Sequence, residues 1–235
     1  MSTLVKATDI TKDYGQDGVV THALRGVSLS LQPGEFAAMV GPSGSGKSTL
    51  LNIIGGLDRP TSGTVEVDGQ RLNDLGKSAL GELRRDHIGF IFQSYNLLPV
   101  LTARENAEYV LRLQGVPAAE RRRRVTEVLA EVGLAGMEDR FPRQLSGGQQ
   151  QRVAIARAVA PEPALVLADE PTANVDSKTG QSLLDLMLRL NQDKGVTFLF
   201  STHDPAVMQR ARRLILLKDG EVAGDGEGLE DIDGV

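Results

Sequence analysis

Residues 41–48 read Gly-Pro-Ser-Gly-Ser-Gly-Lys-Ser and match the G-x-x-x-x-G-K-[ST] pattern of a phosphate-binding loop. Its glycines let consecutive backbone N–H groups turn inward around phosphate oxygens, and a following helix points its positive end at the same place. Lys47 can reach the β- and γ-phosphates of a nucleotide, and Ser48 can ligate Mg²⁺. The alternative, a Gly-Ser turn before an ordinary helix, is disfavoured by the apolar run that precedes the loop. The residues expected to bind nucleotide here are Gly41, Pro42, Ser43, Gly44, Ser45, Gly46, Lys47, Ser48 and Thr49.

An acidic pair follows an apolar run later in the chain. Residues 165–168 are Leu-Val-Leu-Ala, and Asp169 and Glu170 come directly after them. Open α/β sheets place their ligands at the carboxyl ends of strands, so a buried strand here delivers both carboxylates to such a site. Asp169 would hold Mg²⁺, directly or through water, and Glu170 could accept a proton from an attacking water. Alone, the pair is equally well structural, but beside a phosphate loop it indicates phosphoryl chemistry.

A second candidate phosphate-binding helix start lies at residues 145–149, which read Leu-Ser-Gly-Gly-Gln. Ser146 suits an N-cap, Gly147 and Gly148 expose backbone N–H groups, and the helix dipole adds positive potential. The alternative is an ordinary capped helix with a glycine-rich entry.

With these three motifs the chain resembles an ATP-binding cassette (ABC) ATPase, and the LSGGQ pentapeptide is the most specific of them. The resemblance extends over about residues 3–223, and no motif of the family is missing. It implies that the chain is a competent ATPase with ATP and Mg²⁺ as ligands. It also implies a head-to-tail homodimer with ATP at the interface. In that dimer the ATP of one copy is contacted by the other copy's Ser146, Gly147, Gly148 and Gln149.

Four further residues take expected roles from this resemblance. Tyr14, placed before the strand of the N-terminal sheet, matches the aromatic residue that stacks on adenine. Gln93 matches the glutamine that contacts Mg²⁺ and the attacking water. Asp176 matches the loop that crosses between the two monomers, and His203 matches the histidine that contacts the γ-phosphate. For Tyr14, Gln93 and His203 the alternative is a local structural role.

The expected mechanism is a cycle of dimer closure and opening. Two copies close around two Mg·ATP, with Glu170 polarising water while His203 and Gln93 fix its geometry. Hydrolysis removes the phosphate that bridges the copies, so the dimer opens and moves a partner. Residues 95–99, just after Gln93, are expected to help form a groove for a cytoplasmic helix of an integral membrane permease subunit. A plain contact inside the helical subdomain is the alternative for this segment.

The closest resemblance is to the branch that serves macrolide exporters and lipoprotein-releasing complexes. It is carried by LNIIGGLDRPTSG, FIFQSYNLLPVLTARENAE and LSGGQQQRVAIARA, while the PTANVD segment departs from many members. The expected function is therefore to power a transporter. The alternative is an ATPase of a membrane-bound regulatory or cell-division complex that signals without transport. Chromosome-maintenance ATPases carry a long coiled coil between the two phosphate motifs, and translation-factor types carry two cassettes. This chain has neither feature.

The amino-acid composition also excludes or disfavours several classes of protein and several kinds of site. The 235 residues are 40% hydrophobic and 24% charged, as in globular proteins, and the net charge of −5 disfavours nonspecific binding to nucleic acid. The absence of cysteine excludes disulfides, thiolate metal sites and a cysteine nucleophile. No apolar run approaches the roughly 18 residues needed to span a bilayer, and no secretory leader is visible. We expect a cytoplasmic protein that is peripheral on the inner face of the cell membrane through its permease partner.

The elements that position these residues alternate between strands and helices. We expect strands at residues 27–31, 36–40, 65–67, 88–92, 164–168, 196–201, 214–217 and 221–223. Helices are expected after the phosphate loop, from the Thr102/Glu105 capping box, at 117–132 and 146–160, along 183–190, and from Asp204-Pro205. Residues 121–124, four arginines flanked by glutamates, indicate a solvated helix face rather than a nucleic-acid patch. The tail after residue 224 is expected to fray.

The expected fold class is α/β. It combines a P-loop NTPase core on a mostly parallel sheet, an N-terminal antiparallel β-subdomain and an inserted α-helical subdomain. We expect one domain over residues 1–235. Its RecA-like core and β-subdomain take about residues 1–92 and 161–225, and its helical subdomain takes about residues 93–160.

Overall fold

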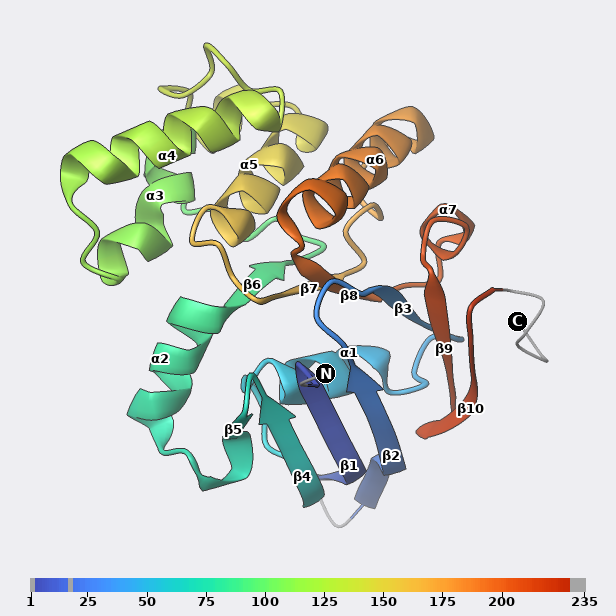
Figure 1. Ribbon diagram of the computed structural model, residues 1–235. Helices are drawn as coiled ribbons and strands as arrows, with labels where there is room; N and C mark the ends of the chain where they lie inside the picture. Colours follow the sequence, from blue (N-terminus) through green and yellow to red (C-terminus); the bar gives the residue numbers. More distant parts are fainter. Residues whose placement is uncertain (1–2, 17–18, 229–235) are drawn as a thin grey trace.

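The computed structural model describes residues 3–16 and 19–228 and arranges their strands in two sheets (Figure 1). The larger sheet has the strand order β10-β9-β3-β8-β7-β6, and all its pairs are parallel except β9–β10. The predicted mostly parallel sheet is confirmed. Its strands are β3 (Phe36–Val40), β6 (Ile88–Ile91), β7 (Leu165–Asp169), β8 (Thr197–Ser201), β9 (Arg213–Lys218) and β10 (Glu221–Gly226).

The smaller sheet is antiparallel throughout, with the order β2-β1-β4-β5, as predicted for the N-terminal part. Its strands are β1 (Val5–Gln16), β2 (Val19–Leu31), β4 (Ser62–Val67) and β5 (Gln70–Arg71). The placement of Tyr14 before a strand was wrong, because Tyr14 lies inside β1. The alternation of buried residues along β1 breaks at an irregularity near Asp9, where φ is 51°. A bulge of this kind hides a strand from a period-two pattern.

Seven α-helices complete the described residues. They are α1 (Lys47–Ile54), α2 (Lys77–His87), α3 (Ala103–Leu113), α4 (Ala118–Glu131), α5 (Gly147–Val159), α6 (Ser177–Lys194) and α7 (Pro205–Met208), with 3₁₀ turns at Leu72–Asp74 and Pro142–Gln144. The capping box of Thr102 with Glu105 is present, and Ser146 forms a second one with Gln149. Helix α2 was not predicted. The final strand β10 continues two residues past the expected fraying point, and residues 229–235 of the tail lie outside the described residues.

Two hydrophobic cores lie on opposite faces of the larger sheet. Along β3, Phe36, Ala38 and Val40 join the core that packs against α3 to α6, whereas Ala37 and Met39 join the core shared with α1 and the smaller sheet. Figure 1 shows the same layering, with helices on one side of the sheet and α1 with the antiparallel strands on the other. Because β3 is buried on both faces, its sequence is a continuous apolar run.

Helices α3, α4 and α5 lie together at one end of the molecule (Figure 1). Their inward side chains belong to the same core as one face of the larger sheet. The division of the chain into a core and a helical subdomain stays a prediction. Within residues 3–16 and 19–228, no helix is both long enough and apolar enough to cross a membrane.

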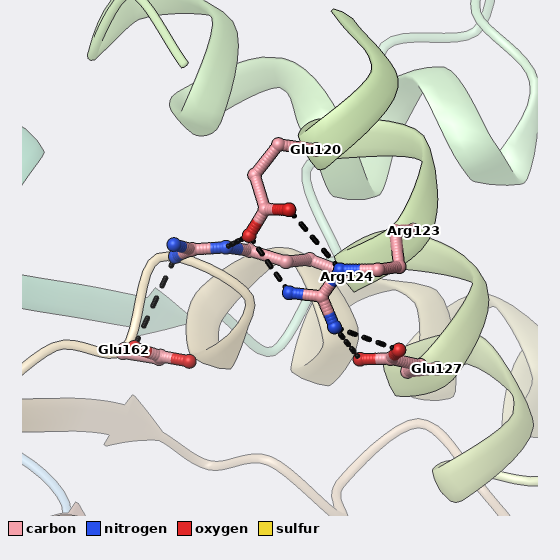
Figure 2. Close-up of polar contacts among 5 residues, drawn as sticks. All are labelled: Glu120, Arg123, Arg124, Glu127 and Glu162. Carbon is pink, nitrogen blue, oxygen red and sulfur yellow. Dashed lines mark hydrogen bonds and ion pairs between the residues drawn. The ribbon is translucent and has the colours of Figure 1, made fainter. Parts of the chain in front are cut away.

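The arginine-rich segment forms a solvated face of α4, as predicted (Figure 2). Arg123 donates to Glu120 and Glu127, and Arg124 donates to Glu120 at 2.6 Å. Arg124 also pairs with Glu162, in the turn after α5, at 3.9 Å. These pairs balance the charge of Arg123 and Arg124 with nearby carboxylates.

Candidate nucleotide-binding and hydrolysis site

The phosphate loop connects β3 to α1 and leaves a pocket of about 320 Å³ at the carboxyl end of the parallel sheet. The pocket is lined by Ala23, Ser43, Gly44, Gly46, Lys47, Ser48, Thr49 and Glu170. Gly41 begins the loop with φ 139°, and a Cβ there would lie 2.1 Å from the carbonyl oxygen of Leu217. Only glycine fits this close approach, so the first glycine of the motif is required by packing against β9.

Lys47 is the first residue of α1 and is buried. Its Nζ donates to the carbonyl oxygens of Gly41 at 2.7 Å and Pro42 at 2.9 Å. Burial lowers the pKa of Lys47, while the nearby charges of Glu170 and Asp169 act in the opposite direction. The ammonium group is thus held inside the loop at the position where phosphate oxygens would lie.

Ser48 and Asp169 face each other across the site. The Ser48 hydroxyl donates to Asp169 Oδ1 at 3.0 Å, although the two residues are far apart in sequence. Hydroxyl and carboxylate oxygens suit Mg²⁺, which takes few protein ligands and fills its shell with phosphate oxygens and water. No cluster of three or more His, Cys, Asp or Glu side chains suited to a metal ion occurs in the described part of the chain. The donor set therefore fits a nucleotide-associated magnesium rather than a protein-only metal site.

Glu170 follows β7, and His203 comes soon after the neighbouring strand β8. The Nδ1 atom of His203 lies 2.6 Å from Glu170 Oε1, and the Thr202 hydroxyl donates to Glu170 Oε2 at 3.0 Å. The Glu170 side chain is 17% exposed, so the carboxylate is sheltered but reaches the phosphate pocket. The predicted pair Glu170 and His203 is thus brought together by the parallel pairing of β7 with β8.

The LSGGQ segment starts α5, and Ser146 is its N-cap. The Ser146 hydroxyl accepts from the backbone N–H of Gln149 at 3.3 Å, and Gln149 Oε1 accepts from the backbone N–H of Ser146 at 2.9 Å. A Cβ at Gly147 would lie 2.9 Å from the Tyr95 hydroxyl, so this helix start is close to the segment after β6. Residues 146–149 do not line the phosphate pocket of their own chain.

Gln93 and Asp176 lie with this second group rather than in the phosphate pocket. The Gln93 side chain is exposed, and the backbone carbonyl oxygen of Gln93 accepts from Asn174 Nδ2 at 2.9 Å. Asp176 caps α6 and accepts from the backbone N–H and the hydroxyl of Thr179. The hydroxyl bond from Thr179 is the main cause that lowers the pKa of Asp176.

Tyr14 lies in β1 of the smaller sheet near Thr49 of α1, is 45% exposed and does not line the phosphate pocket. Its hydroxyl donates to Asp58 Oδ2 at 2.8 Å, and Lys12 Nζ lies 4.8 Å from the ring centroid. Partial burial and the bond to Asp58 raise the pKa of Tyr14, while the hydroxyl of Thr49, in α1, acts in the opposite direction. The ring is therefore anchored at its hydroxyl next to the phosphate-binding helix.

Sequence reasoning missed several residues that hold these groups in place. They are Thr202 on Glu170, Asn174 on Gln93, and Asp58 on Tyr14. Thr202 was discoverable as the residue that directly precedes His203 at a strand end. For Asn174 and Asp58 the sequence carries no such signal, because their partners are distant in the chain.

A buried strand, a glycine loop, a helix that begins at its lysine, and an acidic pair at the end of another parallel strand of the same sheet together define a P-loop nucleoside triphosphatase. A family profile described as "ABC transporter" matches residues 24–173. The chain is 49% identical over 226 residues to "Uncharacterized ABC transporter ATP-binding protein MJ0796" of Methanocaldococcus jannaschii, across 93% of this chain and 95% of that protein. A dimeric structure of MJ0796 in a post-hydrolysis state with ADP and Pi aligns with a TM-score of 0.88 at 47% identity, over 95% of this chain and 98% of that one.

Two further relatives have transport-related names. "Lipoprotein-releasing system ATP-binding protein LolD 1" of Rhodopseudomonas palustris is 45% identical over 226 residues, across 95% of this chain and all of that protein's length (100%). "Macrolide export ATP-binding/permease protein MacB" of Syntrophobacter fumaroxidans is 46% identical over 231 residues, across 97% of this chain but 32% of that protein. The chain belongs to the ABC transporter family and is an ATP-binding ATPase subunit, which confirms the resemblance and its branch.

Proposed function

We propose that this chain powers an export or lipoprotein-extraction complex by closing and opening a homodimer around ATP. The observation that carries the proposal is the convergence of the phosphate loop, the Ser48–Asp169 pair and the Glu170–His203 pair on one edge of the sheet. These groups come from three parallel strands and together supply anion binding, metal ligands and a base.

In this proposal the phosphate loop binds the triphosphate through its backbone N–H groups, and Lys47 moves its donors from loop carbonyls to the β- and γ-phosphates. Tyr14 stacks on the adenine ring beside α1. Ser48 and Asp169 would hold Mg²⁺, which would neutralise charge on the phosphate oxygens, and Gln93, which lies outside the phosphate pocket in this structure, would have to move to join them.

Hydrolysis uses Glu170 to take the proton of a water aligned with the γ-phosphate. His203 and Gln93 fix the position of that water and of the γ-phosphate. The support for Glu170 is its place between the phosphate pocket and the His203 ring.

A second copy completes each site. Ser146, Gly147, Gly148 and Gln149 bind the γ-phosphate of the ATP held by the other copy, and Asp176 lies in the loop that crosses between the copies. The support is that the N-terminus of α5 does not line its own chain's phosphate pocket. Loss of the bridging phosphate then separates the copies.

The partner is an integral membrane permease subunit that holds the chain at the inner face of the cell membrane. A groove of about 340 Å³ supports its docking, since Leu57, Phe90, Phe92, Val110 and Leu113 line it with apolar surface. Asn96, from the predicted docking segment 95–99, lines the same groove, and the nearby Leu98 is 38% exposed. We assign the groove to a cytoplasmic helix of the permease.

Affinity purification from detergent-solubilised membranes tests this function. The tagged chain should retain an integral membrane protein, and ATP hydrolysis by the reconstituted pair should drive movement of a substrate across or out of the bilayer. Recovery of a membrane partner whose ATP cycle moves no substrate would favour the signalling alternative. Recovery of the chain without any membrane protein would contradict the proposal.

A further inference from the structure

Two side chains hold the Glu170 carboxylate, one on each oxygen. His203 contacts Oε1 at 2.6 Å, and Thr202 donates to Oε2 at 3.0 Å. The two differ in exposure, because the His203 side chain is 70% exposed whereas Thr202 is fully buried. An exposed imidazole can turn toward a ligand, but a buried threonine at a strand end cannot.

The direction of the Thr202 bond follows from its other partner. The Thr202 hydroxyl accepts from the backbone N–H of Asp204 at 2.9 Å. A hydroxyl has a single hydrogen, and a carboxylate oxygen can only accept, so that hydrogen points at Glu170. The backbone N–H of Thr202 donates to the carbonyl oxygen of Met39 at 3.0 Å, which ties the residue to the strand that leads into the phosphate loop.

A second side-chain hydrogen bond joins the loops after β7 and β8 in the opposite direction. Thr172, two residues after Glu170, donates its hydroxyl to Asp204 Oδ2 at 2.7 Å, while Asp204 Oδ1 accepts from the backbone N–H of Ala206. The backbone N–H of Glu170 donates to the carbonyl oxygen of Ser201 at 2.9 Å. Each of the loops after β7 and β8 therefore donates a side-chain hydrogen bond to the other. These bonds restrict the rotation of the Thr202 side chain.

We propose that Thr202 is a positioning residue that keeps the Glu170 carboxylate aimed at the phosphate pocket through a donor that is fixed inside the fold. The inference rests on the proposed role of Glu170 as the base. The exposed His203 ring is free to reorient when a ligand binds, whereas the buried Thr202 hydroxyl stays on the second oxygen. Thr202 supplies that donor from inside the fold.

Steady-state ATP hydrolysis by Thr202→Val and Thr202→Ser tests the inference. Valine keeps the shape and removes the hydroxyl, so kcat should fall about 10-fold while the KM for ATP stays within about 2-fold, because only the base is misplaced. Serine keeps the hydroxyl and should retain kcat to within about 3-fold. A wild-type kcat in Thr202→Val, or an equal loss in Thr202→Ser, overturns the inference.

Two further variants keep the result interpretable. Thr202→Ala also removes the hydroxyl, without adding bulk. It replaces Thr202→Val in the test if the melting curve shows that the valine variant does not fold. Glu170→Gln reports on the base itself. If Glu170→Gln hydrolyses ATP at the wild-type rate, the proposed role of Glu170 as the base fails. If Glu170→Gln is inactive while Thr202→Val and Thr202→Ala are fully active, only the role of Thr202 fails.

Discussion

At the scale of single residues, the site depends on groups whose charge the fold has arranged before any ligand binds. The Lys47 ammonium group donates to two loop carbonyl oxygens, and the two carboxylate oxygens of Glu170 contact His203 and Thr202. Such preorganisation means that single substitutions act on separate steps: Lys47 on binding and Glu170 on turnover.

Lys47→Ala should weaken ATP binding. A hydrogen bond to a charged group contributes about 1.5–3 kcal/mol, so the Kd for ATP should rise about 10- to 100-fold. Titration with a fluorescent ATP analogue measures the change, and the unaltered melting temperature serves as the folding control. Wild-type affinity in this variant would remove the phosphate-loop assignment.

Glu170→Gln should separate binding from hydrolysis. The amide keeps the shape but cannot accept the water proton, so kcat should drop about 10²- to 10⁴-fold with ATP binding retained. Gel filtration with Mg·ATP should then show a dimer that the ATP-free sample lacks. Unchanged turnover would contradict the assignment of the base.

At the scale of elements, helix ends and helix faces decide what the polar residues can do. The capping box of Ser146 and Gln149 directs the start of α5, and Asp176 does the same for α6. On α4, Arg123 and Arg124 pair with Glu120, Glu127 and Glu162 (Figure 2). The starts of α5 and α6 are thus ordered by their own side chains, and the charge of these two arginines is balanced by nearby carboxylates.

The α4 network makes a prediction about pH. Hydrogen bonds from Arg123 and then Arg124 lower the pKa of Glu120 from 4.5 to about 2. Since the folded-state pKa is depressed, the stabilisation from Glu120 is present above pH 4.5 and is lost as pH falls toward 2. Carboxyl-carbon NMR titration should show this low midpoint, and Arg123→Gln should raise it. A midpoint at the ordinary value would show that the bonds do not persist in solution.

At the scale of the whole molecule, the phosphate pocket and the start of α5, the second half of the proposed nucleotide site, lie apart within one chain. The phosphate pocket is lined by residues of β2, the phosphate loop, α1 and Glu170, while the start of α5 packs near Tyr95. The proposed head-to-tail dimer would resolve this separation, because each copy would then supply what the other lacks.

Mixing two inactive variants tests the shared site. Lys47→Ala disables the phosphate loop, and Ser146→Arg blocks the start of α5 with a bulky cation. Each alone should hydrolyse little ATP, but an equimolar mixture should regain activity, since mixed dimers contain one site with both halves intact. Absence of any recovery, with both variants folded and able to associate, would place each site within a single chain.

The structure also shows which elements sequence patterns could not supply. Strand β1 escaped prediction because the irregularity near Asp9 breaks its alternation. Helix α2 has no side-chain N-cap and carries Gly81 in its interior, so neither a start signal nor a clean stripe marks it. The placement of Tyr14 failed for the first of these reasons.

The sequence by itself determined the chemistry of the site, because the phosphate loop, the acidic pair and LSGGQ are local motifs whose backbone and side chains act within a few residues. It also determined most strands and helices, since burial of one or two faces of an element produces a regular spacing of apolar residues in the sequence. Only the tertiary structure decided which residues meet: Ser48 with Asp169, and Thr202 with Glu170. Those pairs depend on the order and register of parallel strands, which long-range packing sets and no short segment encodes.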